Sequence, residues 1–450
     1  MINVIESLNQ YLWGILLILI LTAGIYLSLR TRFIQLRLLP DAISSFFSGF
    51  RNNDRQGNIS SHKALCTALA ATVGTGNLAG VAGAIAIGGP GAVFWMWISG
   101  IMGMIIKFAE VVIALHFRYR NDKSEWVGGP MQNIRAGMSP QFHILAYLYA
   151  FFGIIATFGI GNATQVNTIV GSLNSLGTMM DHRQTEMECL LVGIFLGCFV
   201  LYVFRFGIQK IGNCTQVLVP LAAVCYILLA LGVLIVKIWD IPHAFKSICV
   251  GAFQPEAVTG GVVGSVFQAM RIGVSRGIFT NEAGMGTASI AHASAEATSP
   301  ITQGFLGIVE VFLDTIVICT FTALVIICSN QYVMYGVDSG IELTLNAFSS
   351  VYGTWVLIPL TCIICLLASA TILGWGFYGA RCAQFLFGDS AWRYFAILQG
   401  IIVVLAAIAD TSIVWILAEI MNGFMAVPNL ISLIYLSPVF FREIKTYRSV

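Results

Sequence analysis

The stretch VGTGNLAG, residues 73–80, lies within a long apolar segment of the chain. Three of its eight residues are glycine, and Thr75 and Asn77 are polar. Each glycine costs roughly 1 kcal/mol relative to alanine in a helix interior, so this composition favours unwinding. An unwound backbone inside a membrane must be buried or line a cavity, because lipid satisfies none of its hydrogen bonds. On its own, the stretch indicates a broken helix at a site and close helix packing through Gly76 and Gly80 about equally.

The composition of the whole chain is that of a membrane protein. Of the 450 residues, 58% are hydrophobic and 10% are charged, and the mean hydropathy is +0.85. A soluble chain of this length needs far more charge to cover its surface. The net charge of +2 is too small to indicate a nucleic acid as partner. We therefore predict an all-α polytopic protein embedded in the lipid bilayer.

Apolar runs long enough to cross about 30 Å of hydrocarbon recur along the chain. Helix breakers such as GGPG at residues 88–91 separate them. We predict about eleven transmembrane helices, at residues 11–29, 64–87, 92–117, 141–173, 189–204, 214–236, 262–292, 303–328, 355–380, 394–409 and 411–440.

The distribution of Lys and Arg predicts the orientation of these spans. Residues 30–63 contain six of them and residues 118–140 contain four, whereas the alternate connections contain only Arg183, Lys237 and Lys246. Positive loops stay in the cytoplasm, so we expect the N-terminus outside and the C-terminus in the cytoplasm. The membrane is then the plasma (inner) membrane.

A second segment has the same character as the first. RGIFTNEAGMGTASIAHASA, residues 276–295, contains three glycines and the polar residues Thr280, Asn281 and Glu282. A carboxylate at membrane depth costs several kcal/mol without a partner, so Glu282 is expected to face the protein interior. The tetrapeptide NLAG at residues 77–80 is also similar to NEAG at residues 281–284.

The positions of the two segments predict an inverted repeat. When the span at residues 11–29 is set aside, the breaks fall in the first and sixth of the ten remaining spans. Five spans is an odd number, so the two halves are inserted with opposite orientation, which is typical of secondary transporters with a site near the bilayer midplane. The predicted parts are an N-terminal helix and cytoplasmic connection (1–63), two repeats of five helices (64–260 and 261–440) and a cytoplasmic tail (441–450).

Five motifs carry a resemblance to a known family. GTGNLAGVAGAIAIGGPGAVFWMW, GGPM, RGIFTNEAGMG…AHA, DTIVICTFTAL and TILGWGFYG occur in this order over nearly the whole chain. The chain resembles the alanine or glycine:cation symporter family, also called the sodium:alanine symporters. The resemblance implies a LeuT-type fold of five-plus-five inverted repeats with an extra N-terminal helix. It implies a transporter rather than an enzyme, with no cofactor, which moves small neutral amino acids together with sodium by alternating access.

The resemblance also implies a substrate site between the two breaks. The backbone of the first break would hold the substrate carboxylate, and the amide oxygen of Gln165 would accept from its ammonium group. Phe279 would face the same cavity, although a core aromatic is its commoner fate, and Trp375 would be an apolar wall, for which a packing indole is an about equal explanation. The implied substrate-binding residues are Val73, Gly74, Thr75, Gly76, Asn77, Gln165, Phe279, Thr280, Asn281 and Trp375.

The implied sodium site consists of neutral oxygens. By the resemblance, the carbonyls of Ala70 and Val73 face the carbonyl of Leu367 and the hydroxyl of Thr371. Family members usually carry two adjacent hydroxyls here, whereas this chain has Ala370 before Thr371. That departure leaves the ligand set and the affinity for sodium open.

Several alternatives remain open from the sequence. Coupling to protons through Glu282 or Asp314 competes with coupling to sodium, and glutamine competes with alanine as substrate, because one methylene is worth only about 1–3 kcal/mol. A channel is less favoured, since no filter is repeated along the chain. For the other charges near the spans we expect ion pairs, as between Lys107 and Glu110 or Arg276 and Glu282, with Asp410 flanking the last span.

Overall fold

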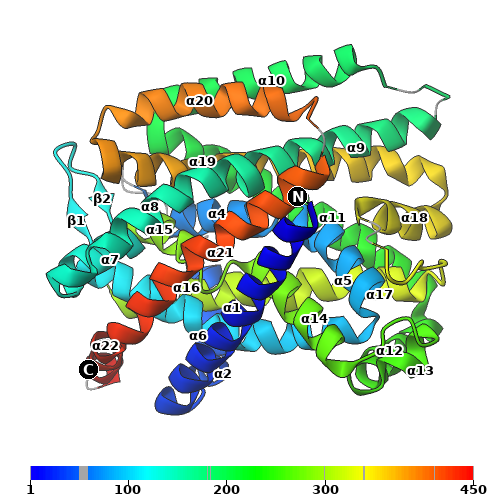
Figure 1. The fold of residues 1–450 in the computed structure, drawn as a ribbon, viewed down its shortest axis with the longest axis horizontal. Helices are drawn as coiled ribbons and strands as arrows, with labels where there is room; N and C mark the ends of the chain where they lie inside the picture. The colour runs from blue at the N-terminus through cyan, green and yellow to red at the C-terminus, as the bar shows by residue number, and fades with distance from the viewer. Residues whose placement is uncertain are drawn as a thin grey trace.

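The computed structural model describes residues 2–49, 59–179, 181–182, 184–297, 299–337, 340–409 and 411–448. The described chain is helical almost throughout (Figure 1). Its strands are the short antiparallel pair β1 (Tyr119–Arg120) and β2 (Trp126–Val127), in which Tyr119 pairs with Val127. This agrees with the predicted all-α class.

The helices up to the end of the first half of the chain, in order, are α1 (Ile2–Thr31), α2 (Ile34–Arg37), α3 (Leu39–Gly49), α4 (Ser61–Thr72), η1 (Gly76–Gly80), α5 (Val81–Gly88), α6 (Gly91–Phe117), α7 (Pro130–Gly137), η2 (Pro140–Phe142), α8 (Ile144–Ala156), η3 (Thr157–Ala163), α9 (Thr164–Met179), α10 (Glu186–Arg205), α11 (Gly207–Val236), η4 (Ile238–Asp240), α12 (Ile241–Phe253) and α13 (Pro255–Thr259). The remaining helices are α14 (Val266–Asn281), α15 (Thr287–Ala293), α16 (Pro300–Val311), η5 (Phe312–Ile318), α17 (Cys319–Cys328), α18 (Gly340–Tyr352), η6 (Thr354–Val356), α19 (Leu357–Phe387), α20 (Ala391–Ala406), α21 (Thr411–Tyr435) and α22 (Ser437–Arg448).

These helices account for the predicted crossings. Eight described helices are long and apolar enough to span a membrane, and the bent pair of α4 with η1–α5 makes a ninth. The shorter apolar helix α20 and the interrupted pair α14–α15 occupy the two other predicted spans, so the described chain agrees with about eleven crossings.

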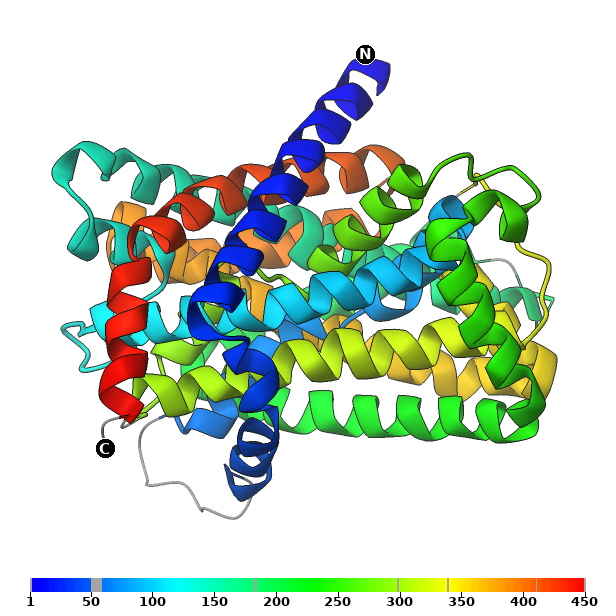
Figure 2. The ribbon, with the colours of Figure 1, turned by 90° about the horizontal axis from the view of Figure 1, so that it is seen from below.

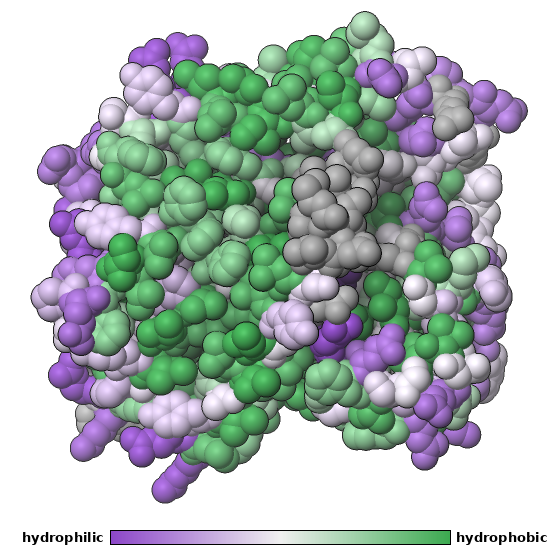
Figure 3. Space-filling model, in the orientation of Figure 1, coloured by the Kyte–Doolittle hydropathy of each residue, from purple (hydrophilic) through white to green (hydrophobic). Residues whose placement is uncertain are grey.

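The surface of the molecule is of the kind expected for a protein embedded in a lipid bilayer. Figure 3 shows a broad hydrophobic face in the middle of the molecule, with hydrophilic residues gathered toward the two ends. Large apolar side chains such as Ile15, Phe195 and Tyr394 are exposed on the surface. In water such a surface would aggregate, whereas in lipid it is the stable arrangement. Helices α12, α13 and α18 lie at one end of the molecule, and α7, the β-hairpin and α22 lie at the other (Figure 1).

The bundle has an interior group of helices and an outer pair. Helix α6 packs against α14, α15 and α16 in the interior, whereas α10 and α20 run side by side along an outer edge (Figure 1). The additional helix α1 packs across α6 and α21, and its N-terminal end projects beyond the bundle (Figure 2). The interior therefore contains the two broken segments, shielded from lipid by neighbouring helices.

Three described helices contain a π-helical stretch. These stretches are η1 in the first broken span, η3 between α8 and α9, and η5 between α16 and α17. A π-helical turn frees a carbonyl or an amide from the regular ladder and is frequent at functional sites. The sequence analysis did not predict η3 or η5.

Candidate functional site

The first predicted break is present. Helix α4 ends at Thr72, and Val73 has φ −79° and ψ 87°, outside the helical region. The chain resumes as η1 at Gly76, and the two parts of the span are bent by 46°. The first amides of a resumed helix have no carbonyl of their own helix to bond, and they carry the positive end of its dipole. The break therefore presents donors suited to a carboxylate around Thr75, Gly76 and Asn77.

The second predicted break is also present, and it is longer. Helix α14 ends at Asn281, and α15 begins at Thr287. Between them Glu282, Gly284 and Gly286 have positive φ angles of 55°, 91° and 75°. Glycine adopts this conformation without steric cost, which explains the spacing of the two glycines in the motif.

A buried carboxylate holds the second break in place. Oε1 of Glu110, on α6, accepts the backbone N–H of Gly284 at 3.0 Å and that of Gly286 at 3.1 Å. It also accepts the amide of Asn429, on α21, at 2.6 Å. Glu110 is 2% exposed, so these three donors supply its charge with the partners that lipid cannot. The sequence analysis had assigned Glu110 to Lys107 instead.

The two breaks meet in the interior. A Cβ atom built on Gly76 would lie 3.4 Å from Cγ2 of Thr280 and 3.9 Å from Cδ1 of Phe279. All three residues were predicted for the substrate site, and the structure brings them together. Phe279 and Thr280 are buried, at 8% and 2% exposure.

Helix segment η5 connects the asparagines of the two breaks. Nδ2 of Asn77 donates to Oδ1 of Asp314 at 2.6 Å, and Nδ2 of Asn281 donates to the hydroxyl of Thr315 at 3.0 Å. Thr315 in turn donates to the other oxygen of Asp314 at 2.8 Å. Oδ1 of Asn77 accepts the N–H of Gly74 at 2.9 Å, so this side chain also fixes the unwound backbone. Sequence reasoning left the role of Asp314 open, and its place in the motif DTIVICTFTAL was the available signal.

Gln165 belongs to the same region. Its Oε1 accepts the hydroxyl of Thr75 at 2.9 Å, and its Nε2 donates to the carbonyl of Ile160 at 3.1 Å. Ile160 lies in η3, where the π-helical turn leaves carbonyls available to side chains. The predicted partner of a substrate ammonium group is thus bonded to the first break.

Three of the four predicted cation ligands come together between α4 and α19. The hydroxyl of Thr371 donates toward the carbonyl of Ala70 at 2.8 Å and toward that of Leu367 at 3.0 Å. A Cβ atom on Gly74 would lie only 2.6 Å from the Thr371 hydroxyl, so the break and α19 are in direct contact here. Val73, the fourth predicted ligand, is buried in the unwound segment beside Gly74. Neutral oxygens of this kind suit a hard monovalent cation.

Trp375 borders the site from α19, one turn beyond Thr371. The side chain is 1% exposed. A Cβ atom on Gly161 of η3 would lie 2.4 Å from Cβ of Trp375, so these two backbones are in close contact. Trp375 is therefore packed directly against η3.

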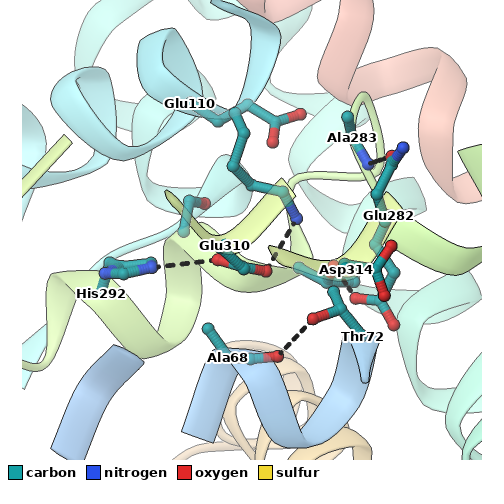
Figure 4. A network of polar contacts seen from close by, with 12 residues as sticks. Ala68, Thr72, Glu110, Glu282, Ala283, His292, Glu310 and Asp314 are labelled. Atoms are coloured by element: carbon teal, nitrogen blue, oxygen red, sulfur yellow. Dashed lines mark hydrogen bonds and ion pairs between the residues drawn. The ribbon is translucent and has the colours of Figure 1, made fainter. Parts of the chain in front are cut away.

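A cluster of buried charges lies beside the second break (Figure 4). Nζ of Lys107 is 3.2 Å from Oε1 of Glu310, and Nε2 of His292 is 3.2 Å from Oε2 of the same glutamate. All three side chains are fully buried. The expected pairing of Lys107 with Glu110 is therefore corrected to an ion pair with Glu310, which lies on the facing helix α16.

The expected pairing of Arg276 with Glu282 is also corrected. Nη1 of Arg276 lies 3.3 Å from Oε1 of Glu419 on α21. Glu282 instead accepts the hydroxyl of Thr287 at 2.5 Å. Asp410 lies outside the described residues.

Comparison with known proteins identifies the family. The model of the "Sodium:alanine symporter family" matches residues 1–450. The "Sodium/alanine symporter AgcS" of Methanococcus maripaludis is 38% identical over 454 residues, which cover 100% of this chain and 98% of that protein. The "Probable sodium/glutamine symporter GlnT" of Bacillus subtilis is 34% identical over 452 residues, which cover 99% of this chain and 90% of that protein.

A solved structure has the same fold. The crystal structure of MhsT in complex with L-phenylalanine matches 85% of this chain and 90% of that chain, with a TM-score of 0.60 and 14% identity. At this identity the match shows the fold, which is of the LeuT type. Because the family match extends over the whole length, this chain belongs to the sodium:alanine symporter family and is a membrane transporter, not an enzyme.

Proposed function

We propose that the protein couples the uptake of alanine or a similarly small neutral amino acid to the inward movement of sodium. The observation that carries this proposal is the oxygen cluster of Thr371, Ala70 and Leu367 beside the first break. It consists of uncharged groups from two helices, so a sodium ion bound there adds a positive charge that favours a nearby carboxylate. Family membership and the sodium/alanine relative support the same coupling.

The substrate would lie between the breaks. Its carboxylate would bind the free amides at Thr75, Gly76 and Asn77, which point out of the first turn of η1. Its ammonium group would bind the amide oxygen of Gln165, in exchange for the Thr75 hydroxyl that occupies this oxygen now.

Residues of the second break and α19 would surround the substrate side chain. A Cβ atom built on Gly76 would already be in van der Waals contact with Thr280 and Phe279, which favours a small substrate side chain. Asn281, bonded to Thr315, would keep the second break in register with the first. Trp375 would set the depth of the pocket. The sodium/glutamine relative makes a longer neutral side chain the second candidate.

Transport would follow from movement of two repeats, residues 64–260 and 261–440, around this site. Each repeat contributes one broken span, so rocking one against the other would expose the site to the two sides in turn. The positive-inside pattern supports an N-terminus outside and a C-terminus in the cytoplasm, in the plasma (inner) membrane.

The proposal is tested by uptake of labelled alanine into proteoliposomes, with sodium replaced by choline at fixed pH. We expect uptake above the passive leak only with sodium. Equal uptake in sodium and choline would remove the coupling, and dependence on a pH gradient alone would favour protons. Inhibition of labelled alanine uptake by an excess of unlabelled glutamine would favour the second candidate substrate, a longer neutral amino acid.

A variant pair locates the cation. Thr371→Val keeps the side-chain volume and removes the hydroxyl, so the sodium concentration for half-maximal uptake should rise. Thr361→Val is the matched control on the same helix, because Thr361 is 3% exposed and its hydroxyl has no partner within the described residues. Equal sodium dependence of the two variants would contradict the assigned ligand.

A further inference from the structure

One buried amide connects the outer layer of the bundle to two elements that border the site. Gln399 lies on α20, most of whose other large side chains face outward, as Tyr394 and Leu405 do at 72% and 56% exposure. Gln399 itself is 0% exposed. Its Nε2 donates to the carbonyl of Ile372 at 3.0 Å and to Oδ1 of Asn162 at 3.2 Å. A single side chain thus bonds both α19 and η3.

The backbone of α19 is shaped to receive this amide. A Cβ atom on Gly376 would lie 2.2 Å from Nε2 and 2.5 Å from Oε1 of Gln399, so any larger residue would expel it. Ile372 and Gly376 are one turn apart on α19. Thr371 directly precedes Ile372, and Trp375 directly precedes Gly376. The amide is therefore anchored at the level of the proposed cation ligand and of the proposed wall of the pocket.

A second contact joins the same two elements. The hydroxyl of Thr157, the first residue of η3, donates to the carbonyl of Trp375 at 3.2 Å. This hydrogen bond and the close approach of Gly161 to Trp375 hold η3 and α19 at a fixed separation. Segment η3 leads directly into Gln165, one residue after the start of α9.

Stability alone does not explain the amide pair. Nδ2 of Asn162 and Oε1 of Gln399 have no hydrogen-bond partner within the described residues, and both side chains are 0% exposed. A buried donor and a buried acceptor without partners destabilise the fold, and apolar side chains of the same shape would avoid that cost. The pair is therefore better explained by the geometry that it imposes.

We propose that Gln399 is a positioning residue that sets the size limit of the substrate side chain. Through Ile372 and Asn162 it fixes the separation of α19, which carries Trp375, from η3, which leads into Gln165. This inference rests on the proposed substrate site, because Trp375 limits the pocket only if the amino acid binds between the breaks. Gln399 touches neither substrate nor ion in this scheme.

Gln399→Met tests the proposal with a side chain of similar length and no donor. Without the amide, Trp375 is free to move outward. The ratio of kcat/KM for alanine to kcat/KM for valine should then fall about tenfold, because the pocket no longer discriminates between small apolar side chains. Asn162→Leu removes one of the two acceptors of this amide and should change the ratio in the same direction. Because Gln399→Met already removes the bond to Asn162, the double variant should not exceed Gln399→Met alone.

The control is Gln35→Met, which removes an equally buried amide bonded to Ser28 at 2.8 Å, far from α19. It should leave the ratio unchanged. A ratio that is unchanged in Gln399→Met and Asn162→Leu, with only the amount of active protein reduced, would overturn the inference. Should Gln399→Met fail to fold, Asn162→Leu decides the question in the same way.

The wild-type protein separates this inference from the proposed function. Sodium-dependent uptake of alanine by the wild type, with unchanged selectivity in both variants, would refute the positioning role alone. Absence of sodium-dependent uptake by the wild type would instead refute the proposed function.

Discussion

Gly74→Ala is the sharpest perturbation of the proposed cation site. The added Cβ atom would lie 2.6 Å from the Thr371 hydroxyl, about 0.8 Å closer than an ordinary contact of 3.4 Å. The hydroxyl cannot simply rotate away, because it is bonded toward the carbonyls of Ala70 and Leu367. The first break and α19 must therefore separate, or the hydroxyl must leave the site.

The cost follows from these contacts. Forcing one methyl group into a packed interior costs about 1–3 kcal/mol. If this cost appears as lost cation binding, the sodium concentration for half-maximal alanine uptake should rise about 5–150-fold. The assay is initial uptake into proteoliposomes over a range of sodium concentrations at constant ionic strength.

Gly80→Ala is the matched control in the same broken span. Its Cβ atom would meet Cγ2 of Thr280 at 3.8 Å, an ordinary van der Waals distance. Both variants add one methyl group to the same broken span, so a larger effect of Gly74→Ala reports the contact with Thr371. Equal sodium dependence of the two variants would refute the reasoning.

Three further predictions concern other parts of the site. Asn77→Leu should abolish alanine uptake while the protein stays monodisperse in detergent, because the side chain bonds both the unwound backbone and Asp314; uptake at the wild-type rate would contradict this assignment. Lys107→Met should remove about 3–5 kcal/mol of stability, seen as a lower melting temperature in detergent, since it leaves Glu310 without its cation. An unchanged melting temperature would show that the ion pair contributes little. Trp375→Leu should raise uptake of valine relative to alanine, measured by competition, and a constant ratio would exclude Trp375 as the wall of the pocket.

The broken spans could be predicted from the sequence because their causes are local. Glycines, an asparagine and a carboxylate within a few residues disfavour a lipid-facing helix, whatever its neighbours are. The structure has its breaks after Thr72 and after Asn281, within both predicted segments. The number of crossings follows from hydrophobic length in the same way.

Partners across the bundle could not be predicted in this way. Asp314 bonds Asn77, which lies 237 residues away, and Arg276 pairs with Glu419, which lies 143 residues away. Only the packing of the helices decides these pairs, so pairing neighbours in sequence gave wrong partners for Lys107 and Arg276. The short helices α3, α12 and α18 were also missed, since each is too short to show as an apolar run of membrane length.

The hydrogen atom of Thr371 has one more implication. It has two acceptors within reach, the carbonyl of Ala70 on α4 and the carbonyl of Leu367 on its own helix. In the proposed cation site, an ion would need a lone pair of the same oxygen, so the hydrogen would turn toward the carbonyl of Leu367 as the ion replaced the bond to Ala70. One contact between α4 and α19 would thus replace another. The free energy with which the ion held these two helices together would then be the difference between the two contacts, which is smaller than the full free energy of ion binding.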